Sequence, residues 1–223
     1  MRVAQVLATA AVLCALTSDG AQTASGTTAA DSVVSVMAHG CPSVTANGTG
    51  LVVQPGIVLT AAHVVAGATS IDVRHGTLVT AGIIVGFDPR NDLALVAVST
   101  DFAPSISLGT ALPGQATAWV VREGNAAAMS VEIIRSVVIN TEDIYREGAT
   151  ARPGFELRAT VRPGDSGAAV VADNHVIAVV WARSRQRDDR AWAINPTASG
   201  VAIWNQLASG RIPPMIDLTR CIH

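Results

Sequence analysis

The chain has 223 residues, of which 49% are hydrophobic and 14% are charged, and its formal net charge is −2. This length is sufficient for one large domain with a proper hydrophobic core. The near-neutral charge provides no basic stripe, so we expect no nucleic acid and no anionic membrane as a partner. All fifteen basic residues are arginine, and the absence of lysine excludes a mechanism that uses a lysine base.

Residues 1–24 have the layout of a secretory signal peptide. A positive start at Arg2 precedes an apolar run over residues 3–16 and a region of small residues up to Ala24. The apolar run is too short for a transmembrane helix. We therefore expect a secreted or periplasmic, cell-envelope protein that leaves the membrane after signal cleavage, with residues 25–223 as the mature domain.

Short runs that alternate in polarity or are rich in β-branched residues fill most of the chain after the signal. Turn signals such as Pro55-Gly56, Asp88-Pro89 and Pro113-Gly114 separate these runs. Short strands at this spacing predict an all-β sandwich or barrel instead of parallel β/α units. The predicted strands are Asp31–Ala38, Gly50–Val53, Ile57–Thr60, Ser70–Val73, Thr77–Phe87, Leu93–Val98, Ala116–Arg122, Met129–Asn140, Glu156–Val161, Ala168–Ala172, His175–Ala182 and Ala191–Ile194.

One helix is predicted near the C-terminal end. Apolar residues recur at helical spacing over Ala198–Leu207, and Gly210 follows just beyond. Of the three cysteines, Cys14 lies in the signal, which leaves Cys41 and Cys221. An even pair in an exported chain favours a disulfide between them, and the alternative is two free thiols.

The stretch VRPGDSGAA, residues 161–169, contains a candidate catalytic nucleophile. Ser166 stands between two glycines, which leave its hydroxyl accessible, and the acidic Asp165 precedes it. Such a hydroxyl becomes a nucleophile only when a base lies within hydrogen-bond reach and a third group orients that base.

The chain supplies a candidate for each of the two missing roles. His63 lies in the run LTAAHVV, and Asp92 precedes the apolar run LALV. Asp88 and Asp101 are nearby alternatives to Asp92, but a catalytic acid is expected where a loop enters a buried strand. The order His63, Asp92, Ser166 is one of the known chain orders of a Ser-His-Asp triad. His39, His75, His175 and His223 have no partners at metal-ligand spacing, so no metal site is expected.

These three motifs together resemble the trypsin/chymotrypsin-like serine proteases. The stretch GTGLVV, residues 48–53, followed by VLTAAHVV, residues 58–65, is similar to bacterial Deg/HtrA-type protease domains. The resemblance covers residues 32–208, so we do not expect the peptide-binding module of those proteases in this sequence.

The resemblance implies a fold of two six-stranded antiparallel β-barrels of the chymotrypsin type with a C-terminal helix. The first barrel would span about residues 32–110 and the second about residues 115–208. His63 and Asp92 would come from the first barrel and Ser166 from the second, so that the site lies in the cleft between them. The expected protein is a monomeric serine endopeptidase that acts on protein or peptide substrates without a cofactor or metal.

The resemblance also implies how substrate is held. The backbone amides of Gly164 and Ser166 would form the oxyanion hole. The primary specificity pocket would have Thr160 at its base and Trp181, Ala182 and Arg183 in its walls. This set favours a small or medium apolar side chain, and Arg183 leaves an acidic side chain as a second possibility.

Two departures from the family pattern bear on activity. No Ile-Val-Gly-Gly-type N-terminus exists to pair with Asp165, so an arginine is its expected partner, although the sequence does not say which. Ala168-Ala169 replaces the usual Gly-Pro. The alternative function is therefore a catalytically weak or inactive protease-like binding protein. A lipase-type esterase is disfavoured because position 168 lacks the glycine of G-x-S-x-G.

Overall fold

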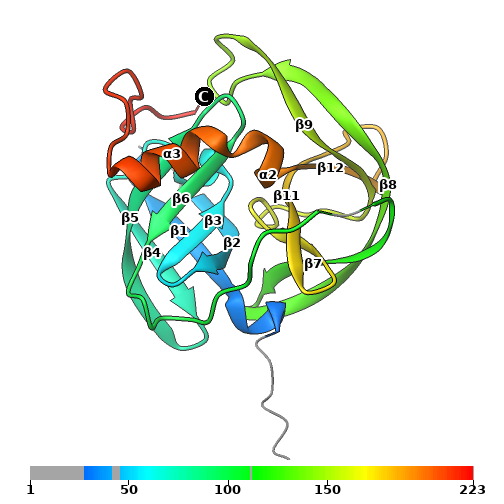
Figure 1. The fold of residues 1–223 in the computed structure, drawn as a ribbon, viewed down its shortest axis with the longest axis horizontal. Coiled ribbons are helices and arrows are strands. Elements are labelled where there is room, and N and C mark those ends of the chain that lie inside the picture. Colours follow the sequence, from blue (N-terminus) through cyan, green and yellow to red (C-terminus); the bar gives the residue numbers. More distant parts are fainter. Residues whose placement is uncertain (1–27, 42–45, 111, 223) are drawn as a thin grey trace, which may run out of the picture.

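The computed structural model describes residues 28–41, 46–110 and 112–222, so the predicted signal peptide lies outside the described residues. The chain forms two closed barrels of six antiparallel strands that lie side by side (Figure 1). This confirms the predicted fold class. None of the helices within the described ranges is long and apolar enough to cross a membrane.

The first barrel contains the strands that precede residue 100. Its strands join in the order β1-β2-β3-β6-β5-β4. The tight turn between β2 and β3 uses Pro55 and Gly56, and Gly56 has a φ of 72°, which glycine adopts without strain. The strand bounds are β1 Val33–His39, β2 Ala46–Gln54, β3 Ile57–Thr60, β4 Ser70–His75, β5 Leu78–Asp88 and β6 Leu93–Ala97.

The second barrel closes in the order β10-β11-β12-β9-β8-β7. Its largest element is the long hairpin of β8 and β9 (Figure 1). The predicted strand at Glu156–Val161 is displaced, because the observed strand begins at Ala149 and ends at Arg158. The strand bounds are β7 Gly114–Arg122, β8 Asn125–Glu142, β9 Ala149–Arg158, β10 Ala169–Ala172, β11 His175–Arg183 and β12 Arg190–Ile194.

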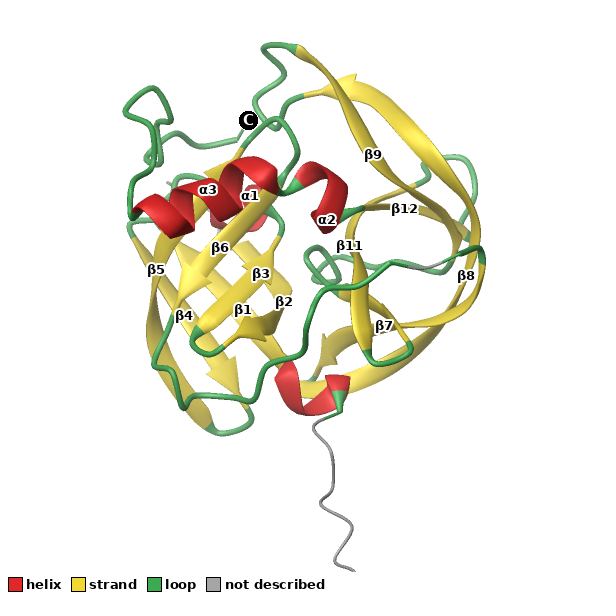
Figure 2. Cartoon of the chain, viewed as in Figure 1, coloured by secondary structure: helices red, strands yellow, loops and turns green. Residues whose placement is uncertain are grey.

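The predicted C-terminal helix is present as two helices that meet at Gly200. The Asn195 side chain accepts hydrogen bonds from the amides of Thr197 and Ala198 and so caps the first of them, while Gly210 ends the second with a φ of 64°. The second helix returns to the first barrel and lies across it (Figure 2). The helix bounds are η1 Ala29–Ser32, α1 Ala62–Val65, α2 Pro196–Ser199 and α3 Val201–Ser209.

Three apolar cores hold the molecule together. One fills the first barrel around Phe87, a second fills the second barrel around Leu157, and the third lies where the barrels meet. This third core joins Leu59 of the first barrel to Val179 of the second and to Ile203 of α3. The two halves are therefore joined by a fully buried apolar surface, which fixes the cleft between them.

A disulfide joins Cys41, after β1, to Cys221 in the C-terminal segment, as predicted, across a sequence separation of 180. The segment has further attachments at Arg220, which forms an ion pair with Glu147 and stacks 4.4 Å from the Tyr145 ring centre. Glu147 and Tyr145 belong to the loop between β8 and β9. The C-terminal segment thus connects both barrels.

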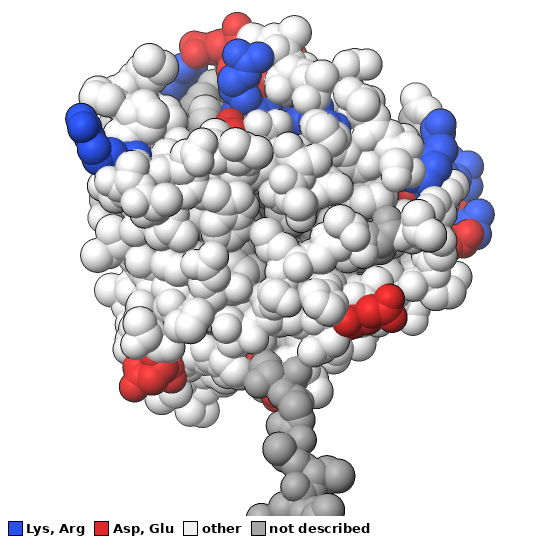
Figure 3. Space-filling model, viewed as in Figure 1, with Lys and Arg blue, Asp and Glu red and all other residues white. Residues whose placement is uncertain are grey.

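The face of the molecule that carries α3 is largely uncharged. Its acidic and basic side chains lie toward the margins of the view (Figure 3). This distribution agrees with the low charged fraction of the sequence.

Candidate active site

His63 and Asp92 are brought together by the first barrel. The short helix α1 carries His63, and Asp92 lies in the turn just before β6. One Asp92 oxygen accepts the His63 backbone amide at 2.7 Å, and the other lies 2.7 Å from Nδ1 of the imidazole. Asp92 is only 1% exposed, whereas the His63 side chain keeps 29% of its surface exposed. The carboxylate therefore fixes the imidazole and leaves its Nε2 edge available.

The structure shows which of the three candidate acids, Asp88, Asp92 and Asp101, contacts His63. The Asp88 carboxylate accepts the amides of Arg90 and Asn91 at 2.9 and 3.1 Å and so closes the turn. Asp92 itself has a φ of 55°, a left-handed conformation that aspartate tolerates better than most residues. Asp101 pairs instead with the Ser99 hydroxyl. Of the three candidate acids, Asp92 is the one bonded to His63.

The pair shifts the pKa values of both partners. Burial alone would lower the pKa of His63, but the charge and hydrogen bond of Asp92 outweigh it, so the pKa is raised. Burial would raise the pKa of Asp92, but the attraction of His63 and its two hydrogen bonds lower it. The arrangement therefore favours an ionised carboxylate beside the imidazole.

Ser166 lies in a glycine turn whose shape is set by a buried ion pair. Gly164 and Gly167 have φ values of 93° and 84°, which side chains disfavour. Asp165, which is 0% exposed, receives both Nη atoms of Arg122 at the end of β7, one of them at 2.8 Å. Arg122 is thus the arginine partner whose type, but not position, the sequence predicts.

The turn that carries Ser166 is pressed against the first barrel. The Thr49 amide donates to the Ser166 carbonyl at 2.8 Å. A Cβ on Gly48 would lie 2.7 Å from the Val64 side chain and 2.9 Å from the Ser166 carbonyl. Gly48 therefore lies closely packed between Val64, the residue after His63, and the turn that carries Ser166. Among the described residues, no hydrogen bond joins the His63 ring to the Ser166 hydroxyl.

The predicted specificity residues fall in different places. Trp181 and Ala182 line a cavity of about 650 Å³ together with His63 and Asp92. Thr160 lines another cavity of about 320 Å³ with Arg158 and Asp189. Arg183 is exposed at the end of β11. Of the predicted specificity residues, only Trp181 and Ala182 border the cavity that also contains His63 and Asp92.

A buried arginine from the second barrel completes the wall of this cavity. Arg152 on β9 is 1% exposed, and its guanidinium lies 4.9 Å from the Trp181 ring centre. Its Nε donates to the Arg90 carbonyl at 2.6 Å and its Nη2 to the Glu142 carbonyl at 3.0 Å. Arg152 thus connects the Asp92 turn to the second barrel. In the sequence nothing distinguishes Arg152 from the other charged residues of this segment, Glu156 and Arg158, so its role could not be predicted.

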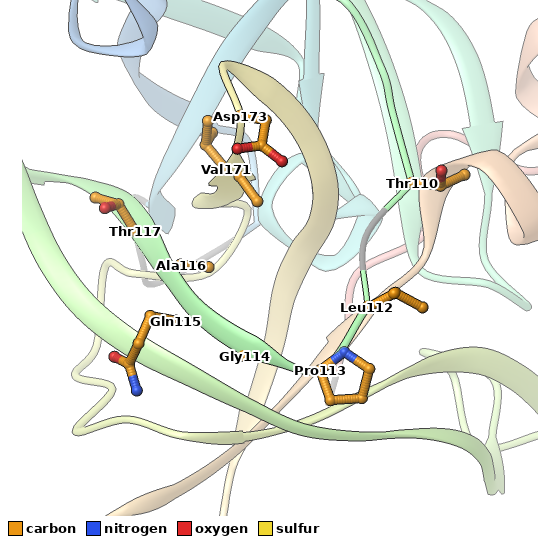
Figure 4. A pocket seen from close by; sticks show the side chains of 10 residues that line it. Thr110, Leu112, Pro113, Gly114, Gln115, Ala116, Thr117, Val171 and Asp173 are labelled. Carbon is orange, nitrogen blue, oxygen red and sulfur yellow. The ribbon is translucent and has the colours of Figure 1, made fainter.

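A further cavity, of about 620 Å³, lies away from His63, between the segment that joins the barrels and β10 (Figure 4). Thr110 and Pro113–Thr117 face Val171–Asp173 across it, and Asp173 is the charged side chain in its lining. Among the described residues, no group of three or more histidine, cysteine or acidic side chains is placed to hold a metal ion.

Comparison with known proteins relates this chain to peptidases. A model of the family described as "Trypsin-like peptidase domain" matches residues 48–179. Serine protease Rv3671c of Mycobacterium tuberculosis is 33% identical over 141 residues, which are 60% of this chain and 35% of that protein. A probable periplasmic serine endoprotease DegP-like of Marinomonas sp. is 28% identical over 171 residues, which are 73% of this chain and 35% of that protein. The chain spans about a third of the length of these relatives.

Solved structures share the fold. The crystal structure of the Rv3671c protease in its active form has a TM-score of 0.75 and 24% identity, and the match covers 87% of each chain. The HtrA-type protease AlgW with a tripeptide has a TM-score of 0.70 and 22% identity, with 82% of this chain and 62% of that chain covered. At these identities the likeness concerns the arrangement of the two barrels.

Proposed function

Because this chain belongs to the trypsin-like peptidase domain family, we propose that it is a serine endopeptidase in which His63, Asp92 and Ser166 form the catalytic triad. The observation that carries this proposal is the doubly bonded His63–Asp92 pair, since it holds the imidazole with one nitrogen bonded and the other turned outward. The serine turn lies next to α1 through Gly48. Side-chain rotation on substrate binding closes the remaining gap, as unliganded sites often have loose catalytic contacts.

The reaction proceeds in two acyl-transfer steps. The Ser166 oxygen attacks the peptide carbonyl carbon, and its proton passes to Nε2 of His63, whose imidazolium Asp92 stabilises. The carbon–nitrogen bond then breaks, and His63 returns the proton to the leaving amine. In the second step, water gives a proton to His63 and attacks the acyl carbon. The bond between that carbon and the Ser166 oxygen then breaks, and His63 returns the proton to the Ser166 oxygen, which releases the carboxylic acid and restores the serine.

The negative oxygen of each tetrahedral intermediate sits between the backbone amides of Gly164 and Ser166. Donors aimed at charge that develops only in the transition state contribute roughly 3–4 kcal/mol each. The φ of 93° at Gly164 fits this role, because it is the left-handed conformation of a tight turn that glycine adopts without strain. The Arg122–Asp165 pair supplies the fixed anchor that a new N-terminus would otherwise provide.

The substrate is a protein or peptide, and the protein acts as a monomer. Trp181 and Ala182, which border the cavity beside His63, favour a small or medium apolar side chain. The sequence assigns Thr160 and Arg183 to the same pocket, but Thr160 lines a separate cavity and Arg183 is exposed at the end of β11. Residues 1–24 are a signal peptide and residues 25–223 the peptidase domain. The periplasmic relatives support an exported, cell-envelope location.

Covalent labelling of the mature protein tests this function. A fluorophosphonate is expected to label Ser166, since its oxygen displaces fluoride while His63 takes the proton. Ser166→Ala should abolish labelling and reduce peptide hydrolysis by at least about 10⁴-fold. Ser136→Ala, an exposed serine on β8, is the matched control and should retain both. A folded wild-type protein that neither labels nor hydrolyses peptides would favour an inactive, protease-like binding protein.

A further inference from the structure

Thr49 on β2 is the point at which three segments of the proposed active site meet. It is 0% exposed, although it carries a polar hydroxyl. Its amide donates to the Ser166 carbonyl at 2.8 Å, and its hydroxyl donates to the Gly164 carbonyl at 3.0 Å. Both bonds cross from the first barrel to the second. One first-barrel residue therefore holds the serine turn at two carbonyls.

The Thr49 hydroxyl uses its accepting capacity as well. It receives the Val121 amide at 3.3 Å, and Val121 directly precedes Arg122, which pairs with Asp165. The Thr49 carbonyl in turn accepts the Thr60 hydroxyl at 2.8 Å, three residues before His63. Thr49 thus touches the segments that carry the serine, its arginine anchor and the histidine.

The two carbonyls bonded by Thr49 lie on either side of the Ser166 amide, which the proposed function places in the oxyanion hole. The peptide unit that carries the Ser166 N–H lies between the peptide units whose carbonyls belong to Gly164 and Ser166. Thr49 holds these flanking units, while Arg122 holds the Asp165 side chain between them. The turn has little room to move away, because a Cβ on Gly167 would lie 2.1 Å from the Thr49 carbonyl.

We propose that Thr49 is a positioning residue whose hydroxyl orients the Ser166 amide of the oxyanion hole. This inference rests on the proposed function, because an oxyanion hole matters only if Ser166 acylates. It goes beyond the triad by assigning part of the transition-state geometry to a first-barrel side chain. A displacement of about 1 Å at such donors is sufficient to cost about 10²-fold in rate.

The test compares Thr49→Val with Thr49→Ser. Valine keeps the shape and the backbone amide but removes the hydroxyl, whereas serine keeps the hydroxyl and loses one methyl. We expect Thr49→Val to lower kcat for a peptide substrate by about 10- to 100-fold with KM nearly unchanged. The rate of fluorophosphonate labelling should fall in parallel, because its phosphoryl oxygen occupies the same hole. Thr49→Ser should recover most of both rates.

A variant at a second buried hydroxyl is the control that distinguishes a positioning role from a general loss of stability. The Ser199 hydroxyl on α2 donates to the Pro153 carbonyl at 3.2 Å, away from the serine turn, so Ser199→Ala should lose stability but keep kcat. Urea unfolding confirms that each variant is folded. The inference is overturned if folded Thr49→Val keeps wild-type kcat and labelling, if only its KM changes, or if Thr49→Ser is equally impaired. A folded wild type without labelling would instead contradict the proposed function and this inference with it.

Discussion

At the scale of single residues, His63 and Asp92 determine how activity depends on pH. The neighbouring carboxylate raises the pKa of His63 above its ordinary value of 6.5. Only the neutral imidazole accepts the serine proton, so kcat/KM should fall as the pH falls through this raised pKa and should reach its plateau on the alkaline side. A pH–rate profile of kcat/KM between pH 4.5 and 9 measures the midpoint, which we expect above 6.5.

Replacing the carboxylate checks the cause of this shift. Asp92→Asn should move the acidic midpoint downward and lower the rate by about 10⁴-fold, because the imidazole loses its charge partner and its preferred tautomer. Asp143 lines the same cavity, but its carboxylate accepts the amides of its own loop, so Asp143→Asn is the matched control with an unchanged midpoint. An Asp92→Asn profile that coincides with the wild type would contradict the assignment.

The sequence identifies the reactive residues more readily than those that hold them. Ser166, His63 and Asp92 stand in local motifs whose residue types state their chemistry. The partner of Asp165 is one of fifteen arginines, and nothing local distinguishes Arg122, because the pairing depends on how β7 lies beside the serine turn. The role of Thr49 is equally invisible in the sequence, because its hydroxyl bonds a carbonyl of the other barrel.

At the scale of elements, strands with regular alternation are predicted well and interrupted ones are not. β9 contains the buried Arg152, then Pro153 and Gly154, none of which favours a strand. The structure accommodates them because Arg152 bonds two carbonyls and Gly154 lies against the Ala193 carbonyl, where a Cβ would be 2.2 Å away. The C-terminal helix is interrupted at Gly200, where the backbone also packs too closely for a side chain. A Cβ there would collide with the Pro196 carbonyl.

The attachment of the serine turn to β7 gives an element-scale prediction. Arg122→Met leaves the carboxylate of Asp165 buried without its partner, which should lower the free energy of unfolding by about 3–5 kcal/mol and abolish hydrolysis. Urea unfolding and a peptide assay measure the two effects. The second change in Arg122→Met/Asp165→Asn removes the buried charge and should restore much of the stability but not the activity.

A surface pair provides the control for this experiment. Arg187 and Asp189 form an ion pair within the exposed loop between β11 and β12, and exposed pairs contribute little to stability. Arg187→Met should therefore unfold at nearly the wild-type urea concentration and keep its activity. Equal losses in Arg187→Met and Arg122→Met would show that burial of Asp165 is not the cause.

At the scale of the whole molecule, the two barrels act as one unit because the C-terminal part of the chain returns to the first barrel. α3 packs on β5, where the buried Gln206 side chain bonds both the amide and the carbonyl of Phe87 at 2.7 and 3.1 Å. The sequence predicts two barrels from strand spacing and family resemblance. It does not reveal this return, since an amide–backbone contact across 119 residues leaves no local pattern.

The disulfide makes the last attachment of the C-terminal segment, and its contribution can be measured. On the chain-entropy model, a cross-link between residues 180 positions apart stabilises the folded state by about 5 kcal/mol. Ile216 and Leu218 also pack against the first-barrel core, so the segment should stay docked without the cross-link. Cys41→Ser/Cys221→Ser should therefore lower the free energy of unfolding by about 3–5 kcal/mol in urea titrations while keeping a single transition. Wild-type protein under reducing conditions should unfold at the same urea concentration as this variant. Two separate transitions in the variant would mean that the disulfide, and not the apolar surface between the barrels, joins the halves into one cooperative unit.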